Sequence, residues 1–170
     1  YLSYSRFADV INNKKSFNEA FSPSLNIGVN KSKQFKYDLS IGNTVSYNSN
    51  KTSQSAKLLQ YFTNDLNVNA TIYVKKVWSL INDYNYTFQQ KTFSTDNNIN
   101  IHIWNITLQR TFKSNEFTAY FTVRDLLNQN IGISRSFSGN TYREVNNDRL
   151  KRYFMIGFTW NFKNKAAGAK

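Results

Sequence analysis

The chain has 170 residues, of which 16% are aromatic, and it contains one proline, six glycines and no cysteine. This composition favours β-sheet over a turn-rich or disordered chain, and the missing cysteine excludes thiolate metal sites and disulfide bonds. No apolar run reaches the roughly 18 residues of a membrane-spanning helix, so a helical membrane protein is excluded as well.

The formal net charge of +12 raises the question of nucleic-acid binding. The basic residues are scattered, however, and many lysines fall where turns or loops are predicted: Lys14, Lys15, Lys31, Lys33, Lys51, Lys57, Lys75, Lys76, Lys91 and Lys113. We interpret this charge as solvated connections and predict no nucleic-acid partner. A second interpretation is attraction to the phosphates of membrane lipid or lipopolysaccharide.

Taken in chain order, eight segments alternate apolar and polar side chains with the two-residue period of a β-strand. The first, residues 1–11, is the least regular because Arg6 lies among its apolar positions. The others are residues 25–29, 35–47, 66–74, 78–88, 104–112, 117–123 and 148–162.

The last segment shows the pattern most clearly. Tyr153, Met155, Gly157, Thr159 and Asn161 form one face, and the other face is entirely apolar: Phe154, Ile156, Phe158, Trp160 and Phe162. Four of the eight segments, residues 1–11, 66–74, 78–88 and 104–112, are nine to eleven residues long, which is what a tilted strand needs to cross the hydrocarbon core of a bilayer. We therefore expect an antiparallel transmembrane β-barrel of the bacterial outer membrane, with the apolar row of the last strand facing lipid.

One segment breaks the pattern. Near Ile99, Ile101 and Ile103 the apolar row occupies odd positions, and from Trp104 it occupies even ones. Because a one-residue slip turns every side chain to the other face, either a β-bulge lies near Ile103 or the first part of this strand stands above the membrane. We favour the second explanation.

The predicted connections alternate in length. Residues 31–34, 75–77 and 113–116 form short connections, whereas residues 12–19, 48–58, 89–98 and 125–147 form long ones. Outer-membrane barrels have short periplasmic turns and longer extracellular loops, so the C-terminal end is expected in the periplasm. Aromatic residues near both strand ends fit interfacial girdles: Trp78, Phe112, Phe117, Trp160 and Phe162 at one end, and Tyr47, Tyr61, Phe62 and Phe88 at the other.

The predicted inward face contains mostly Ser, Thr, Asn and Gly. An eight-stranded barrel has a narrow interior that side chains must fill, and these small residues would leave it underfilled. They suit the wall of a wide lumen, so the chain is expected to be a segment of a larger barrel.

Residues 121–162 resemble the C-terminal end of TonB-dependent-receptor-like outer-membrane β-barrel proteins. The resemblance rests on the turn formed by Asp125, Leu126, Leu127 and Asn128, on the Ile-Ser-Arg step at residues 133–135, and on the Arg-Tyr-Phe opening of the last strand at residues 152–154. Phe162 is similar to the terminal aromatic residue of that family. Members usually end near this residue, whereas here a tail, residues 163–170, follows barrel residues 1–162.

The resemblance implies a barrel of about 22 strands that imports large nutrients. It implies no catalytic residue and no cofactor. The implied partners are outer-membrane lipid and lipopolysaccharide, a TonB-type energy-coupling protein reached through N-terminal parts, and a surface lipoprotein lid or a larger outer-membrane complex.

The residues themselves offer little enzyme chemistry. His102 is the only histidine, the ten acidic residues are scattered singly, and no nucleophile-elbow or phosphate-loop motif occurs. We therefore predict no metal site. Asp125 is expected to accept hydrogen bonds from nearby backbone N–H groups in an Asx-type turn. A patch for an anionic ligand or lipopolysaccharide is the second interpretation of four arginines otherwise explained as scattered loop charge: Arg124, Arg135, Arg143 and Arg149.

Three hypotheses follow. The first is a transport protein, of which this chain is the C-terminal barrel portion. The second is a free-standing eight-stranded outer-membrane barrel that acts as a structural anchor, an adhesin or a lipid-modifying enzyme. The third is a soluble all-β domain that binds carbohydrate or nucleic acid. A second sheet packed against Phe154 and Trp160 would exclude the first two.

Overall fold

The computed structural model describes residues 1–11, 13–54, 57–95, 97–112, 116–138 and 141–161. These residues form eleven strands: β1 (Tyr4–Ile11), β2 (Lys14–Phe21), β3 (Ser24–Lys33), β4 (Tyr37–Thr52), β5 (Leu59–Val74), β6 (Trp78–Gln89), β7 (Ile99–Phe112), β8 (Phe117–Arg124), β9 (Ile133–Ser138), β10 (Thr141–Asn146) and β11 (Tyr153–Trp160). Phe162 and residues 163–170 lie outside the described residues. The described part of the chain contains no helix long and apolar enough to cross a membrane.

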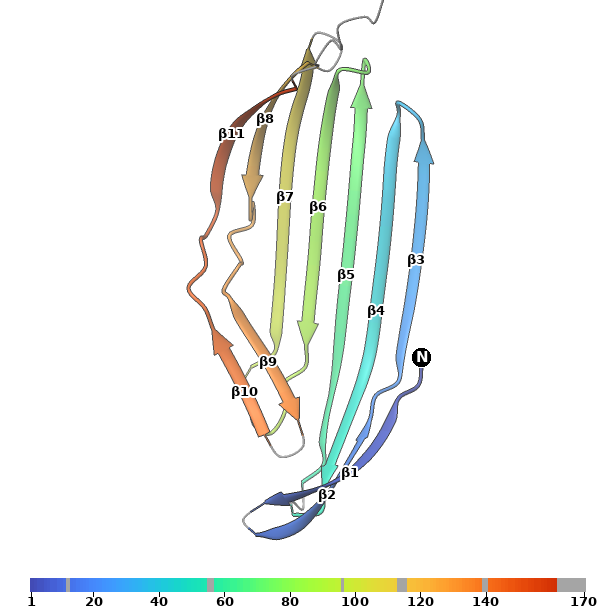
Figure 1. Ribbon diagram of the computed structural model, residues 1–170, viewed down its shortest axis with the longest axis vertical. Helices are drawn as coiled ribbons and strands as arrows, with labels where there is room; N and C mark the ends of the chain where they lie inside the picture. The colour runs from blue at the N-terminus through green and yellow to red at the C-terminus, as the bar shows by residue number, and fades with distance from the viewer. Residues whose placement is uncertain (12, 55–56, 96, 113–115, 139–140, 162–170) are drawn as a thin grey trace, which may run out of the picture.

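Nine strands form one antiparallel sheet, and the remaining two, β9 and β10, form a separate hairpin between β8 and β11 (Figure 1). The main path runs β1-β2-β4-β5-β6-β7-β8-β11, with β3 paired to β4. The prediction of an all-β antiparallel fold is confirmed. Among the described residues the sheet is open, because β1 and β11 end the path and do not pair with each other.

The predicted count of eight strands is too low for two reasons. The long connection expected at residues 12–19 is instead mostly strand β2, which pairs with β1 along its whole length and with the end of β4. The long connection expected at residues 125–147 contains the β9–β10 hairpin.

Strands β2 and β3 act as one long strand interrupted at Pro23. The pairs Phe21↔Ser49 and Ser24↔Ser46 keep the same register against β4. Across the interruption, the backbone N–H of Tyr47 donates to the carbonyl of Pro23 at 3.1 Å. Proline lacks an N–H group, so it removes a donor from the ladder without shifting the register. If β2 and β3 are counted as one interrupted strand, the nine strands of the main sheet become eight.

One-to-one pairing places the long apolar rows of β3 to β8 and of β11 on the same face of the sheet. In the row that joins β6 to β11, Leu80 pairs with Leu108, Leu108 with Phe121, and Phe121 with Ile156. The opposite face, here called the inner face, carries most of the Ser, Thr and Asn residues. The apolar face is called the outer face.

No second sheet covers the outer face in the described residues, since the extensive contacts of each main-sheet strand are with its ladder neighbours. On β11, the exposed fractions are 63% for Phe154, 87% for Ile156, 62% for Phe158 and 52% for Trp160. Aromatic rings stack along this face, with ring centroids 5.4 Å apart for Phe117 and Trp160. The described residues therefore do not form the two-layer arrangement that would have excluded a membrane barrel.

The pattern break near Ile103 is not a β-bulge. The β6–β7 ladder runs one-to-one from Trp78↔Arg110 to Gln89↔Ile99 without an extra residue. Ile99 and Ile101 thus lie on the inner face, where they are buried. The inner face itself becomes apolar at this end of the sheet.

Gly157 allows a close approach between the last two strands of the sheet. It pairs directly with Tyr120, and a Cβ atom at position 157 would lie 2.0 Å from Cζ of the Tyr120 ring. We predict that Gly157→Ala displaces the ring and lowers the free energy of unfolding by about 1–3 kcal/mol. Equilibrium unfolding followed by tryptophan fluorescence would measure this loss.

Gly42→Ala is the matched control, because Gly42 also lies on the inner face within a strand. A Cβ atom there would meet none of the described neighbouring atoms within 4 Å. Replacing glycine with alanine inside a strand is then neutral or stabilising by up to about 1 kcal/mol. Equal losses for the two variants would show that the Tyr120 ring is not the cause.

Candidate functional site

The β9–β10 hairpin folds across the inner face at the end of the sheet where the long connections gather (Figure 1). The ring of Phe137 packs on Tyr61 of β5, with centroids 5.0 Å apart. Arg135 Nη1 donates to the backbone carbonyl of Asn97 at 2.5 Å. The hairpin is therefore held against the sheet by an aromatic contact and tied to the connection between β6 and β7 by a hydrogen bond.

The buried apolar core of the described chain lies at this same end. It consists of Leu59, Tyr61, Ile99 and Ile101, all at inner-face positions of β5 and β7. Tyr61 was predicted to belong to the outer aromatic girdle, and that prediction is wrong, because the side chain points to the other face. The hairpin, which the sequence prediction missed, supplies the apolar partner that these residues need.

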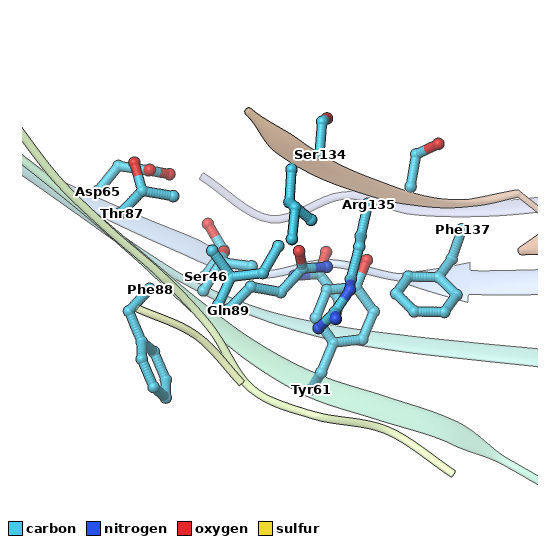
Figure 2. A pocket seen from close by; sticks show the side chains of 14 residues that line it. Ser46, Tyr61, Asp65, Thr87, Phe88, Gln89, Ser134, Arg135 and Phe137 are labelled. Carbon is cyan, nitrogen blue, oxygen red and sulfur yellow. The ribbon is translucent and has the colours of Figure 1, made fainter. Parts of the chain in front are cut away.

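A cavity of about 430 Å³ lies between the hairpin and the inner face (Figure 2). The sheet contributes mainly hydroxyl and amide side chains to it: Ser46, Asn48, Thr63, Thr87 and Gln89. Asp65 adds a carboxylate, while Tyr61 and Phe137 add aromatic rings at the hairpin side. Such a lining can exchange hydrogen bonds with a polar solute and place a ring against it.

An ion pair stabilises the hairpin itself. Arg135 Nε lies 2.6 Å from Glu144 Oε2, and the Arg135 side chain is only 11% exposed. The Tyr142 hydroxyl also donates to Glu144. Two hydrogen bonds, the larger effect coming from Tyr142 and the smaller from Arg135, lower the pKa of Glu144 below its ordinary value. The pKa of Tyr142 is raised, mainly by desolvation and secondly by its hydrogen bond to Glu144.

The turn at residues 125–128 connects β8 to the hairpin. The Asp125 carboxylate is buried, and its two oxygens accept hydrogen bonds from the backbone N–H groups of Gln129 and Asn130, at 3.0 Å each. Asp125 and Asn128 adopt positive φ angles of 51° and 57°, which Asp and Asn tolerate better than other residues with a Cβ. These bonds form a local Asx-type cap.

Further bonds tie this turn to its neighbours. Asn105 Oδ1 of β7 accepts the Asp125 N–H at 3.0 Å, and the Leu126 N–H donates to the carbonyl of Trp104 at 2.8 Å. Arg152 donates its backbone N–H to Asn128 Oδ1 at 3.1 Å and a guanidinium N–H to the Leu126 carbonyl at 3.2 Å. Leu127 is exposed. The turn thus joins β7, β8 and the start of β11.

The four arginines predicted to form a patch for an anionic ligand lie in different elements. Arg124 ends β8 opposite Tyr153, and Arg149 lies in the segment before β11. In the hairpin, Arg135 pairs with Glu144 and Arg143 pairs with Ser136. Adjacent pairs along a ladder face opposite sides, so Arg135 and Arg143 do not share a surface.

His102 lies on the outer face, among aromatic side chains. Its Nδ1 is 2.7 Å from the Tyr84 hydroxyl, and its ring stacks on Tyr86 with centroids 4.6 Å apart. Within the described ranges, no three His, Cys, Asp or Glu side chains are grouped so that they could hold a metal ion. Comparisons of this chain with protein-family models, curated proteins and solved structures gave no match.

The Asp125 cap generates a prediction. Asp125→Ala removes the acceptor of two part-buried backbone N–H groups, at a cost of about 0.5–1.5 kcal/mol for each lost hydrogen bond. We expect a lower yield of folded protein and faster amide hydrogen exchange at Gln129 and Asn130, without a change in ligand preference. Asp83→Ala, which removes an inner-face carboxylate from the middle of β6, serves as the control. If Asp125→Ala folds normally but loses the nutrient import expected from the sequence, Asp125 would instead have a functional role.

The hairpin should also respond to pH. Because folding lowers the pKa of Glu144 from its ordinary value of 4.5, the stability it contributes is present above that pH and is lost as the pH falls through the folded pKa. A nitroxide spin label at the exposed Ser136 position should become more mobile as the pH is lowered below the ordinary value of 4.5. In the Glu144→Gln background, the label mobility should be independent of pH in the same range. If that variant still shows the wild-type increase in mobility at low pH, Glu144 is excluded as the titrating group.

Proposed function

We propose that this chain is part of the wall of an outer-membrane β-barrel transport protein. The single observation that carries this proposal is a one-layer sheet with a continuous exposed apolar face and a polar inner face. Soluble proteins rarely expose apolar patches larger than a few hundred Å². Bilayer hydrocarbon would cover the outer face without a second protein layer.

The open edges support a larger barrel. A sheet edge inside a bilayer would leave backbone N–H and C=O groups without partners, so strands that span a membrane close into a barrel. The path among the described strands ends at β1 on one side and at β11 on the other, far apart in Figure 1. The free-standing eight-stranded anchor or adhesin requires these two strands to pair. Further strands completing a wider barrel, of the TonB-dependent-receptor-like kind, agree better with this arrangement and with the small inner side chains.

The two ends of the sheet support an orientation. The connections at residues 34–36 and 75–77 are short and lie at one end, whereas the β9–β10 hairpin lies at the other (Figure 1). By the usual arrangement of bacterial barrels, the hairpin end is extracellular and β11 ends in the periplasm. The cavity under the hairpin would then lie at the outer mouth of the lumen, where an imported solute first meets the barrel.

In this role the chain has no catalytic task and requires no cofactor of its own. The import of a large nutrient would need the partners implied by the resemblance at residues 121–162: an energy-coupling protein of the TonB type and, at the surface, a lipoprotein lid or a larger complex. Membrane lipid and lipopolysaccharide would surround the outer face.

Two neighbouring substitutions on β11 test the membrane placement. Ile156→Lys puts a charge on the most exposed outer-face residue of that strand, and Met155→Lys puts the same charge on the inner face. We expect Ile156→Lys to lower the free energy of unfolding in liposomes by about 2–4 kcal/mol and Met155→Lys by about 1 kcal/mol or less. Urea titration of the reconstituted protein would measure both, and equal losses would contradict the assignment of the faces.

Ile156 is a better probe of the bilayer interior than Phe158, which lies on the same face of β11. Phe158 pairs with Ala119 next to Arg110 and Trp78, only two residues from the end of β11. A charge there lies near the interface and costs about 0–1 kcal/mol. A protein that stays monodisperse in buffer without detergent would contradict the membrane proposal itself.

A further inference from the structure

Arg110 is an unusual residue on the outer face. In the outward rows of β6, β7, β8 and β11 it is the only Lys, Arg, Asp or Glu. Its side chain is exposed, and its guanidinium carbon lies 5.0 Å from the centroid of Trp78 and 4.6 Å from that of Phe112. The two aromatic rings thus hold the charge at a fixed place on the outer face.

The described residues give this charge no acidic partner. Among them, the ion pairs are Arg6 with Glu19 and Arg135 with Glu144, and neither involves Arg110. Aromatic rings attract a guanidinium, but they leave its N–H donors without acceptors. Within the described ranges nothing neutralises this charge, so an anion bound beside Arg110 would stabilise it on a lipid-facing surface.

A hollow lies beside Arg110. It has a volume of about 320 Å³ and is bounded by Leu108, Ala119, Phe121 and Ile156, with Arg110, Trp78 and Phe112 at its rim. The hollow exists because Ala119 is the smallest residue of the outward row. Its neighbours in that row, Phe117, Phe121 and Phe158, are all large.

We propose that this site binds one anionic phospholipid of the periplasmic leaflet, an inference that rests on the proposed membrane placement. The phosphate accepts hydrogen bonds from Arg110, and an acyl chain fills the hollow above Ala119. A guanidinium matches the geometry of phosphate oxygens and is the stronger choice for this contact.

The position of Arg110 along the strand fits a phospholipid headgroup. It pairs with Trp78, the first residue of β6, and lies two residues before the end of β7. At about 3.3 Å per residue, this is about 7 Å from the strand end, at the level of the interfacial aromatic residues. Lys75 and Lys76 lie in the adjacent turn, and Lys76 Nζ sits 4.9 Å from the Phe35 ring, so the surrounding rim is also positive.

The test compares three variants of the intact protein, purified in detergent and titrated with phosphatidylglycerol. Arg110→Gln removes the charge, Ala119→Phe fills the hollow while keeping the charge, and Arg124→Gln removes an exposed arginine from the inner face as the control. Native mass spectrometry counts the lipid molecules retained. We expect the first two variants to bind phosphatidylglycerol about tenfold more weakly than the wild type, and the control to bind it unchanged.

Phosphatidylcholine, which carries no net charge, is titrated in parallel and should bind weakly to all four proteins. Insertion into phosphatidylcholine liposomes, followed by urea unfolding, separates the two proposals. If the wild type does not insert, the membrane placement and the lipid site both fail. If all variants insert and bind phosphatidylglycerol equally, the lipid site alone is overturned. Loss of a dimer in Arg110→Gln with unchanged lipid binding would also overturn it, in favour of a second copy of the chain on this face.

Discussion

Every property of this sheet depends on the unbroken register of its ladders. Because side chains alternate between faces, one inserted residue in β6 or β7 would move all later apolar side chains to the inner face. The pairing instead runs one-to-one from β4 to β11, and it holds even across Pro23. The outer face is therefore apolar across strands far apart in the sequence. The polar cavity and the exposed apolar surface are two consequences of this single constraint.

The sequence predicted best what the two-residue period encodes. It placed Phe154, Ile156, Phe158 and Trp160 together on one face of the last strand, and the antiparallel all-β fold followed from the same pattern. It missed β2, where Lys14 and Lys15 resemble a solvated turn, and it missed β9 and β10. Strands that have no continuous apolar face to cover do not need strict alternation, so their sequences carry a weaker signal. Tyr61 was misplaced for a related reason: its ring packs on Phe137, a partner 76 positions away in the sequence that no local pattern reveals.

The turn at residues 125–128 and the hairpin form one structural unit. The Asp125 carboxylate fixes the N–H groups of Gln129 and Asn130, and Gln129 in turn accepts the backbone N–H of His102 at 3.2 Å. Gly132 follows with a φ of 67°, and a Cβ atom there would lie 2.0 Å from the carbonyl oxygen of Asn147. Any residue with a Cβ atom would clash with this carbonyl oxygen, so position 132 requires glycine. The chain is therefore directed from the end of β8 across the inner face by local bonds, before the contact between Phe137 and Tyr61 holds the hairpin down.

Arg110 and Arg135 show how the two faces treat the same side chain. On the inner side, Arg135 is largely buried and is satisfied by Glu144 and by the carbonyl of Asn97. A buried guanidinium would be strongly destabilising without such partners, so the hairpin and its ion pair belong together. On the outer face, the partners of Arg110 among the described residues are the rings of Trp78 and Phe112. These rings orient the charge but do not accept its hydrogen bonds in the sheet plane, so an anion beside the sheet would supply the acceptor that we propose. One arginine is satisfied by its own fold and the other is available to an external anion, and this difference distinguishes the two faces of the same layer.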